Sequence, residues 1–524
     1  MKRTVCCVIF LMLCVCLLTS CNPENKCEHE YGEWKVLRWP SCSEVGISER
    51  VCECGHKETK DIAILNHRYE NGICINCKTE LDKSTLAPGA YDEDFNLIAD
   101  WDRLVKRYGM QIEENYVFVH DEIEFFAEND HRPEKIFYSD PDLARTQILV
   151  VPEGVERIGK YALYDSQRLT EVILPKSLKR IDSSAFYNCT SLTTINLENV
   201  QSIGEAAFGC CIKLEQINLT ESLTTLEAGA FGGCHSLMSA TLPDSLSEIG
   251  AGVFSNCEGL YRVHLPLSLT EIPDDCFKGC EKLFDVNLHE GLVSIGKSAF
   301  KDCDQLKKAT MPSTMRIIGA EAYYSSGITE IYLNDGLTHL GARALSSCKA
   351  LKEIIIPDSV TELGVGTFYY SAFIERIVIG SGVTTIPKSF AGSCWALCDI
   401  QIGENVAVIE DEAFEYCWML RSITIPENIT YIGDDAFVGC NRLVEIINLS
   451  DIDLCPSGSH PSKIDKYAMS VHTGESKIFR EGDFLCYNLD GVLYLLDYVG
   501  NMENPTLPET IGGKEYIVWE MPID

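Results

Sequence analysis

Apolar side chains return along the middle of this chain at a nearly constant interval. One copy of the pattern has apolar or small residues at Leu169, Val172, Leu174, Pro175, Leu178, Ile181, Ala185, Phe186 and Cys189, and Leu192 begins the next copy. The aromatic position recurs at Phe208, Phe231, Phe254, Phe277, Phe300, Phe368, Phe414 and Phe437, and Leu163, Tyr323, Leu345 and Ala391 hold the same register. The thirteen copies follow one another in steps of 23 residues, with two steps of 22. A period held over so many copies predicts a solenoid of stacked coils.

Each copy predicts a short strand followed by a turn. Leu169, Val172 and Leu174 are spaced Leu-x-x-Val-x-Leu, as expected for a short strand whose apolar side chains point to one face. Pro175 ends that strand, because proline has no N–H to donate to a ladder. Leu178 and Ile181 return apolar groups to the core, and residues 183–186 predict a single helical or 3₁₀ turn. A single coil cannot bury its own apolar face, so we expect one continuous core with a parallel strand in every coil.

The details of the repeat indicate a family. The pattern is clearest in residues 423–440, where it is made by Ile423, Thr424, Ile425, Pro426, Ile429, Ile432, Gly433, Ala436, Phe437 and Cys440. This pattern resembles the BspA-like leucine-rich repeat family, and the resemblance covers about residues 148 to 448. It implies an α/β leucine-rich-repeat solenoid and a bacterial surface protein that acts in adhesion. The family has no shared catalytic residues, so the resemblance implies none here.

Residues outside the array divide into further segments. We expect a signal peptide at 1–20, a Cys/His-rich module at 21–80, a linker and N-terminal cap at 81–147, the solenoid at 148–450, and a C-terminal cap or extension at 451–524. The spacing of Leu97, Trp101, Leu104 and Tyr108 predicts one amphipathic helix between Phe95 and Gly109. In the C-terminal segment, residues 484–500 predict a hairpin that turns at Asp490-Gly491.

The N-terminal sequence predicts that the protein lies outside the cytoplasm. The net charge limits the classes of partner that it can bind. A basic pair, Lys2-Arg3, precedes an apolar run that is too short to span a membrane and that ends at Cys21. This end resembles the lipobox of bacterial lipoproteins, so we expect Cys21 to carry a lipid on the extracellular face of a bacterial membrane. An ordinary signal peptide is the alternative. The formal net charge of -34 argues against nucleic acid as a partner, since phosphate binding needs clustered lysine and arginine.

Cysteine occurs in two distinct settings. Ten of the copies have cysteine at one fixed position, which is Ser166, Ser326 or Ser371 in the others: Cys189, Cys211, Cys234, Cys257, Cys280, Cys303, Cys348, Cys394, Cys417 and Cys440. A small position that alternates between cysteine and serine favours buried free thiols. Disulfides or a metal are the alternative, but stacked Cβ vectors should run parallel and not face each other.

The second setting is the N-terminal module. Cys74 and Cys77 have the spacing of a metal knuckle, whereas Cys52 and Cys54 are one residue closer than the usual spacing. We expect these four cysteines to hold structural zinc. Three disulfides among the cysteines of this exported segment are the alternative, since so short a segment needs covalent or metal support.

Two groups of side chains are candidates for ligand binding. Tyr332, Ile355 and Val378 occupy the outward strand position of three consecutive copies and predict an exposed apolar stripe. Ordinary β-propensity on a sheet surface is the alternative. The second group lies on the turn near the cysteine position and contains Tyr369, Tyr370, Trp395, Tyr416 and Trp418. Stacked exposed aromatics suit a sugar face or a protein hot spot, whereas packing against a neighbouring loop or cap is the alternative.

Together these features predict a lipid-anchored binding or adhesion protein that uses its solenoid to bind host or microbial proteins or glycans. The alternative is a structural spacer of the cell envelope without a dedicated ligand. We do not expect an enzyme, because the array offers no histidine paired with serine or cysteine and no glycine loop for phosphate. Apart from structural zinc, no cofactor is expected.

Overall fold

A computed structural model describes residues 33–38, 46–51, 57–62, 69–70, 73–74, 83, 86–92, 95, 97–101, 103–104, 110–113, 116–119, 145–454, 460–466, 468–501 and 507–519. The chain forms two compact units, one of Met1–Leu86 with Tyr91–Leu97 and one of Ala87–Ala90 with Ile98–Asp524. In the first unit, β1 (Lys35–Arg38), β2 (Gly46–Val51) and β3 (Lys57–Ile62) form an antiparallel sheet. A separate short pair joins β4 (Tyr69–Glu70) to β5 (Ile73–Cys74).

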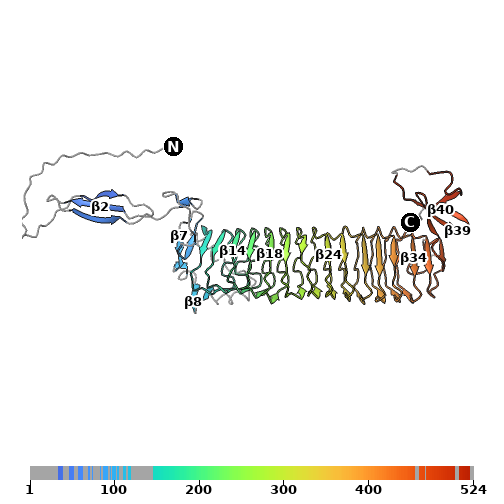
Figure 1. Ribbon diagram of the computed structural model, residues 1–524, viewed down its shortest axis with the longest axis horizontal. Helices are drawn as coiled ribbons and strands as arrows, with labels where there is room; N and C mark the ends of the chain where they lie inside the picture. The colour runs from blue at the N-terminus through green and yellow to red at the C-terminus, as the bar shows by residue number, and fades with distance from the viewer. Residues whose placement is uncertain are drawn as a thin grey trace, which may run out of the picture. The chain divides into compact units, whose positions relative to one another are not determined.

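The second unit is a parallel β-solenoid, as the repeat predicts, with its coils following one another in one row (Figure 1). Each coil contributes a front strand: β10 (Ile148–Val150), β12 (Glu171–Ile173), β14 (Thr194–Asn196), β16 (Gln216–Asn218), β18 (Ser239–Thr241), β20 (Arg262–His264), β22 (Asp285–Val286), β24 (Lys308–Thr310), β26 (Glu330–Tyr332), β28 (Glu353–Ile356), β30 (Arg376–Ile379), β32 (Asp399–Gln401), β34 (Ser422–Ile425), β36 (Glu445–Asn448) and β37 (Ser470–His472). Equivalent residues of adjacent coils pair in register, for example Leu149 with Val172. The parallel register explains the constant period of the sequence.

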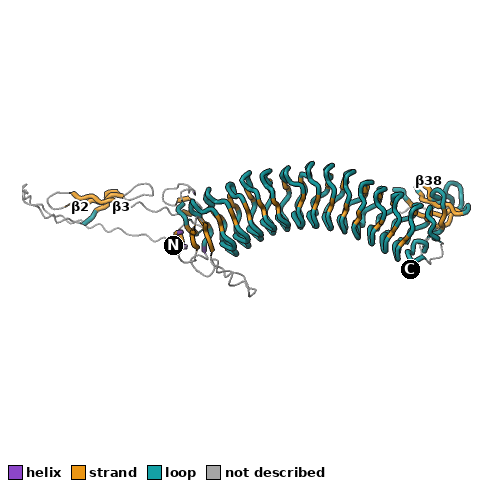
Figure 2. The backbone as a smooth tube through the Cα atoms, turned by 90° about the horizontal axis from the view of Figure 1, so that it is seen from below, coloured by secondary structure: helices purple, strands orange, loops and turns teal. Residues whose placement is uncertain are grey.

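A second, lateral strand follows in each coil, which the sequence pattern did not reveal. These strands are β11 (Arg157–Ile158), β13 (Arg180–Ile181), β15 (Ser202–Ile203), β17 (Thr225–Leu226), β19 (Glu248–Ile249), β21 (Glu271–Ile272), β23 (Ser294–Ile295), β25 (Ile317–Ile318), β27 (His339–Leu340), β29 (Glu362–Leu363), β31 (Thr385–Ile386), β33 (Val408–Ile409) and β35 (Tyr431–Ile432). They also pair in parallel, as Ile158 does with Ile181. The strands are short, and loops and turns make up most of each coil (Figure 2).

The lateral ladder is interrupted at two places, and each has a proline. β19 does not pair with β21, and β29 does not pair with β31, within the array that the structure describes. In other coils an amide just after the lateral strand donates to the preceding coil, as Gly250 does to the Leu226 carbonyl at 2.7 Å. Pro273 and Pro387 occupy this position in the coils of β21 and β31. Because proline has no N–H, the bond is lost where the ladder breaks.

The third face of each coil, which we call the turn face, is not helical, so the predicted helical or 3₁₀ turn at residues 183–186 is corrected. Ala185 donates to the Asp182 carbonyl at 3.2 Å and Cys189 donates to Phe186 at 3.2 Å, which closes successive tight turns. Ser184 and Asn188 have φ of 54° and 61°, and these left-handed residues prevent a helix. The Phe186 amide donates to the Ala207 carbonyl of the next coil at 2.7 Å, so this face is also laddered.

Aromatic rings stack along the inside of the array. Phe186 and Phe208 are fully buried, with their ring centroids 5.0 Å apart and their planes 7° apart. The stack continues through successive coils to Tyr323. At the coil where Ala391 holds the aromatic register, Phe390 supplies the buried ring and packs edge-to-face on Phe368 at 5.2 Å. The core is therefore aromatic at this coil too, although the ring comes from the neighbouring position.

The repeated cysteines are buried free thiols, as expected. Each of them donates a hydrogen bond to a backbone carbonyl of the preceding coil, as Cys257 does to Phe231 at 3.2 Å. Ser371 makes the equivalent bond to the Leu345 carbonyl at 2.7 Å. Cysteine and serine are both small and can both donate such a bond, which explains why they alternate, although the buried hydroxyl of Ser166 has no partner among the described residues.

Extra strands precede the first coil. β6 (Gly89–Tyr91) and β7 (Leu97–Asp100) extend the front sheet beyond β10, and the hairpin β8 (Met110–Glu113) and β9 (Tyr116–Val119) extends the lateral sheet beyond β11. The start of the expected helix is therefore a strand, on which Leu97 is exposed, whereas Trp101, Arg103 and Leu104 are helical, so the prediction is confirmed in part. Trp101 and Leu104, which follow, are buried in the core of the array. Pairing with the open edge of the front sheet outweighs the helical periodicity of residues 97–100.

The last coil is followed by a small sheet. β38 (Ile478–Glu481), β39 (Phe484–Leu489), β40 (Val492–Tyr498) and β41 (Tyr516–Val518) lie side by side in this order. The predicted hairpin is confirmed, since β39 and β40 are antiparallel and both turn residues, Asp490 and Gly491, have positive φ. Asp497 of this sheet pairs with Arg421 and with Arg442, the latter at 3.2 Å, which ties the sheet to the last coils.

Candidate binding surface

The five aromatic residues predicted on the turn face lie in three consecutive coils, and we call this group the aromatic edge (Tyr369, Tyr370, Trp395, Tyr416 and Trp418). Trp395 and Trp418 follow the buried Cys394 and Cys417 in adjacent coils, and their rings stack with centroids 5.1 Å apart and planes 6° apart. The Tyr370 ring meets Trp395 edge-to-face at 5.3 Å, and Tyr369 lies 6.4 Å from Tyr370. The period of the solenoid thus brings together side chains up to 49 positions apart in sequence, from 369 to 418.

Backbone bonding holds the stacked indoles in register. The Met419 amide donates to the Trp395 carbonyl at 3.2 Å, so the loop beneath one ring is bonded to the loop beneath the other. The ring spacing of 5.1 Å is close to the distance of about 4.8 Å between neighbouring strands of a sheet. The coil spacing therefore sets the stacking distance of the indoles.

Much of the aromatic edge is exposed. Tyr370 has 49% of its surface accessible, and Tyr416 and Trp418 have 45% each. Trp395 and Tyr369 are half-buried. Exposed aromatic area of this kind is typical of surfaces that bind partners, because burying it against a partner releases water from a large apolar surface.

Two tyrosines of the edge are held in an unfavourable backbone conformation. Tyr370 and Tyr416 have φ of 61° and 55°, at a position where other coils have residues such as Asn188, Gly233 or Asp302. A bulky residue in the left-handed region costs roughly 1–2 kcal/mol. The Tyr416 ring also lies over Gly439, where a Cβ would come within 2.4 Å of its Cδ1 atom. Positive φ recurs at this position in the other coils with residues of several types, so the conformation belongs to the repeat and the two tyrosines adapt to it.

The second predicted group, the stripe of Tyr332, Ile355 and Val378, lies on the front strands. Ile355 and Val378 are paired across β28 and β30, whereas Tyr332 belongs to β26, which pairs with β24. Tyr332 and Ile355 are exposed and Val378 is half-buried. Arg376 pairs beside them with Glu353 and with Asp399, the latter at 2.8 Å. The charged side chains next to the stripe are therefore already paired with one another.

A third exposed apolar group, with two aromatic members, was not identified from the sequence. Met238, Tyr261 and Phe284 occupy one position in three consecutive coils and are all exposed, and the rings of Tyr261 and Phe284 stack at 6.0 Å. The position directly follows a buried leucine, where other coils have Thr170, Thr193 or Lys307. Aligning the copies at this position would have shown the change from polar to aromatic residues.

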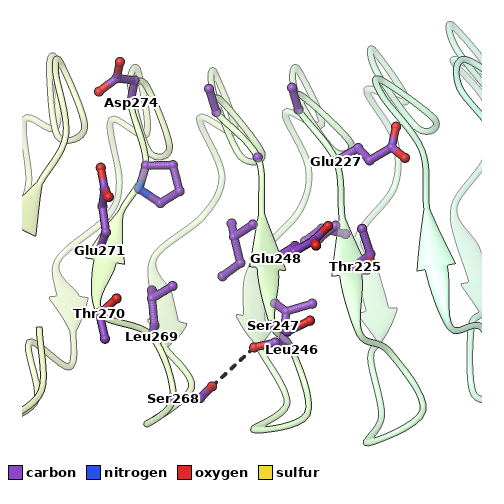
Figure 3. A pocket seen from close by; sticks show the side chains of 16 residues that line it. Thr225, Glu227, Leu246, Ser247, Glu248, Ser268, Leu269, Thr270, Glu271 and Asp274 are labelled. Atoms are coloured by element: carbon purple, nitrogen blue, oxygen red, sulfur yellow. Dashed lines mark hydrogen bonds between the residues drawn. The ribbon is translucent and has the colours of Figure 1, made fainter.

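A groove of about 910 Å³ lies at the first interruption of the lateral ladder (Figure 3). It is lined by residues of three coils, including the carboxylates Glu227, Glu248, Glu271 and Asp274. Ser268 Oγ donates a hydrogen bond to the Leu246 carbonyl at 3.3 Å, between two of these coils. The lining residues include no histidine, cysteine, lysine or arginine among the residues that the structure describes. The groove follows from the loss of ladder bonds at Pro273.

The residues predicted to carry the lipid and to bind the metal lie almost entirely outside the described residues. Cys21, Cys52, Cys54 and Cys77 are outside the described residues, and of Cys74 only the backbone, at the end of β5, is described. Within the described ranges no cluster of three or more histidine, cysteine or acidic side chains is arranged to hold a metal ion. The same ranges contain no helix with the length and apolar character needed to cross a membrane.

Comparison with known proteins agrees with the repeat. The profile described as "BspA type Leucine rich repeat region (6 copies)" matches residues 133–260, 226–348 and 316–444. A leucine-rich repeat protein from Bacteroides ovatus is 25% identical, with 57% of this chain and 86% of that chain covered and a TM-score of 0.53. A leucine rich cell surface protein from Faecalibacterium prausnitzii is 26% identical, with 63% and 91% covered and a TM-score of 0.41. Among proteins with curated descriptions, none matches this chain.

Proposed function

Because the chain belongs to the BspA-type leucine-rich repeat family, we propose that it is a binding protein whose aromatic edge contacts a partner protein at the bacterial surface. The observation that carries this proposal is the stacked pair Trp395 and Trp418, of which Trp418 is exposed, together with the exposed Tyr370 and Tyr416. Such rings provide a rigid apolar area with few rotatable bonds, which is the usual chemistry of a protein hot spot.

The geometry of the pair favours a protein over a sugar. Trp395 and Trp418 each turn one face toward the other at 5.1 Å, so the pair offers a sugar fewer open ring faces than two separate indoles would. Tyr370, Tyr416 and Trp418 keep 45–49% of their surface exposed, and exposed aromatic area of this kind suits the side chains of a protein partner. A glycan partner is the competing outcome of the experiment below.

We further propose that Cys21 carries the lipid that anchors the protein to the outer face of a bacterial membrane, and that its role there is adhesion. The apolar run ending at Cys21 supports the anchor. The structural zinc at Cys52, Cys54, Cys74 and Cys77 also remains a proposal. Metal analysis of the purified chain is expected to find about one zinc per molecule, lost on chelation. No zinc and no free thiol in this segment would instead identify disulfides.

A binding screen tests the proposed function. The full chain, in mild detergent, is applied to immobilised mucins, matrix proteins, bacterial surface proteins and neutral glycans, beside Trp395→Ala/Trp418→Ala. We expect protein hits that the double variant loses. Hits confined to glycans would overturn the choice of partner. An absence of hits would favour a spacer role in the cell envelope.

A further inference from the structure

Carboxylates lie beside the aromatic edge. The side chain of Glu415 and the ring of Tyr369 both lie over Gly392, where a Cβ would be 3.0 Å from Glu415 Cγ and 3.1 Å from Tyr369 Cδ2. Burial raises the pKa of Glu415, and the negative charges of Glu412 and Asp435 raise it further, while Lys388 lowers it. Lys388 itself pairs with Glu412 at 3.3 Å. Glu415 therefore lies beside a ring of the aromatic edge, and Glu412, Asp435 and Lys388 lie near enough to Glu415 to shift its pKa.

Elsewhere the same chain places cations between a ring and a carboxylate. Lys301 Nζ lies 4.6 Å from the centre of the Tyr324 ring and pairs with Glu321 at 2.8 Å. Lys308 lies 5.0 Å from the Tyr332 ring and pairs with Glu330 at 3.4 Å.

Arg262 repeats the arrangement, over Phe284 at 6.0 Å and with Asp285 at 2.7 Å. Three coils thus combine a ring face and a carboxylate to bind a basic side chain. The aromatic edge presents the same two components, and its tryptophans are the aromatic residues that attract cations most strongly.

We propose that the aromatic edge binds a basic protein segment, whose arginine or lysine side chains lie against Trp418 and the tyrosines and pair with Glu415, Glu412 and Asp435. This inference rests on the proposed function and names the chemistry of the partner. The formal net charge of -34 favours it, because a strongly acidic protein attracts basic partners and speeds their association. Arginine fits better than lysine, since its planar guanidinium stacks on a ring while it pairs with a carboxylate.

Two soluble peptides test this inference on the full chain. One peptide alternates arginine with glycine, and the other replaces every arginine with citrulline, which keeps the shape and removes the charge. We expect the arginine peptide to bind at least about tenfold more tightly, and Trp395→Ala/Trp418→Ala to weaken it about tenfold. Trp395→Phe/Trp418→Phe keeps an aromatic ring at both positions and is expected to weaken binding less than the alanine variant does. It replaces the alanine variant in the test if that variant folds poorly.

Charge variants separate a site from general attraction. Glu412→Gln/Glu415→Gln should weaken the arginine peptide about threefold or more, whereas Glu248→Gln/Glu271→Gln, which removes the same charge from the lateral groove, should leave it unchanged. Equal losses in the two charge variants, or equal binding of both peptides, would overturn the basic partner. If the protein screen still gives hits that the tryptophan variant loses, the proposed function stands and only the basic partner is wrong. If both fail, the proposed function fails as well.

Discussion

The indole rings of Trp395 and Trp418 lie parallel and 5.1 Å apart in adjacent coils of the solenoid. Their separation in sequence is one period of 23 residues, so the repeat that builds the core also builds the surface. A column of equivalent positions on the outside of the array is a contiguous strip in space. Changing one residue type in a few neighbouring copies is enough to create a binding surface on an otherwise regular scaffold.

The support beneath Tyr416 can be tested without touching any proposed contact. In Gly439→Ala the new Cβ would lie 2.4 Å from Tyr416 Cδ1, at a φ of 75°, so the tyrosine must move. We expect a loss of roughly 1–2 kcal/mol in unfolding free energy and weaker binding of the partner. Urea unfolding and a binding assay measure the two effects.

The matched control is Gly482→Ala, which has a φ of 60° but no atom within 4 Å of the added Cβ. It should show the stability loss with unchanged binding. Unchanged binding by Gly439→Ala as well would mean that Tyr416 is not part of the surface.

The buried thiols predict a loss of stability in alkali. Burial raises the pKa of Cys257 to about 12, whereas the pKa of an exposed thiol is about 8.5. Above that lower value the unfolded chain releases a proton that the folded chain retains. The contribution of this thiol is therefore complete below about pH 8.5, and it falls by about 1.4 kcal/mol per pH unit until the folded pKa is reached.

Cys257→Ser supplies the control for this prediction. Serine keeps a small hydrogen-bond donor, as Ser371 shows, but does not titrate in this range. The unfolding free energy of the unaltered chain minus that of Cys257→Ser should therefore decrease as pH rises from about 8 to about 10. A difference that stays constant over this range would show that the thiol is not buried as described.

The interruption of the lateral ladder predicts a local difference in amide exchange. The amides of Val293 and Ser294 donate to the Thr270 carbonyl at 2.7 and 3.3 Å, whereas β21 has no ladder partner in β19 within the described array. We expect the amides of Thr270 and Glu271 to exchange with deuterium faster than those of Val293 and Ser294. Pro273→Gly, which restores an N–H, should slow the exchange. Equal exchange at the two coils would argue that the ladder is continuous.

The proposed anchor has a direct test in cells. Cys21→Ala removes the only atom to which the lipid could attach at the expected cleavage site, so the protein should pass from the membrane fraction to the medium. Fractionation followed by immunoblotting measures this. Retention of the variant in membranes would rule out anchoring through Cys21.

Much of the fold could be predicted because the period is a property of packing. Phe186 and its equivalents recur since each ring stacks on the ring of the next coil, and Cys257 and Ser371 alternate since both donate to a buried carbonyl. The lateral strands were not foreseen, because two residues are too few to show an alternation. The turn at residues 183–186 was predicted as helical because its hydrogen bonds span three residues, but the positive φ of Ser184 cannot be read from serine.

The candidate surface was only partly predictable. Trp395 and Trp418 could be recognised because tryptophan is rare in this chain. Tyr261 and Phe284 were not recognised, because tyrosine and phenylalanine are common and their repeat position is polar in other coils. The strain at Tyr370 and the approach of Tyr416 to Gly439 depend on backbone conformation. Sequence spacing therefore located the aromatic edge, and only the structure revealed how it is held.

The most direct test of the central claim is the equilibrium affinity of three forms of the full chain for the strongest protein hit of the screen. These forms are the unaltered chain, Trp395→Ala/Trp418→Ala, and Tyr261→Ala/Phe284→Ala, which removes the other exposed stacked pair. The account predicts that the tryptophan variant binds at least about tenfold more weakly while the Tyr261/Phe284 variant binds like the unaltered chain. Unchanged affinity in the tryptophan variant, or an equal loss in both, would contradict a binding site at the aromatic edge.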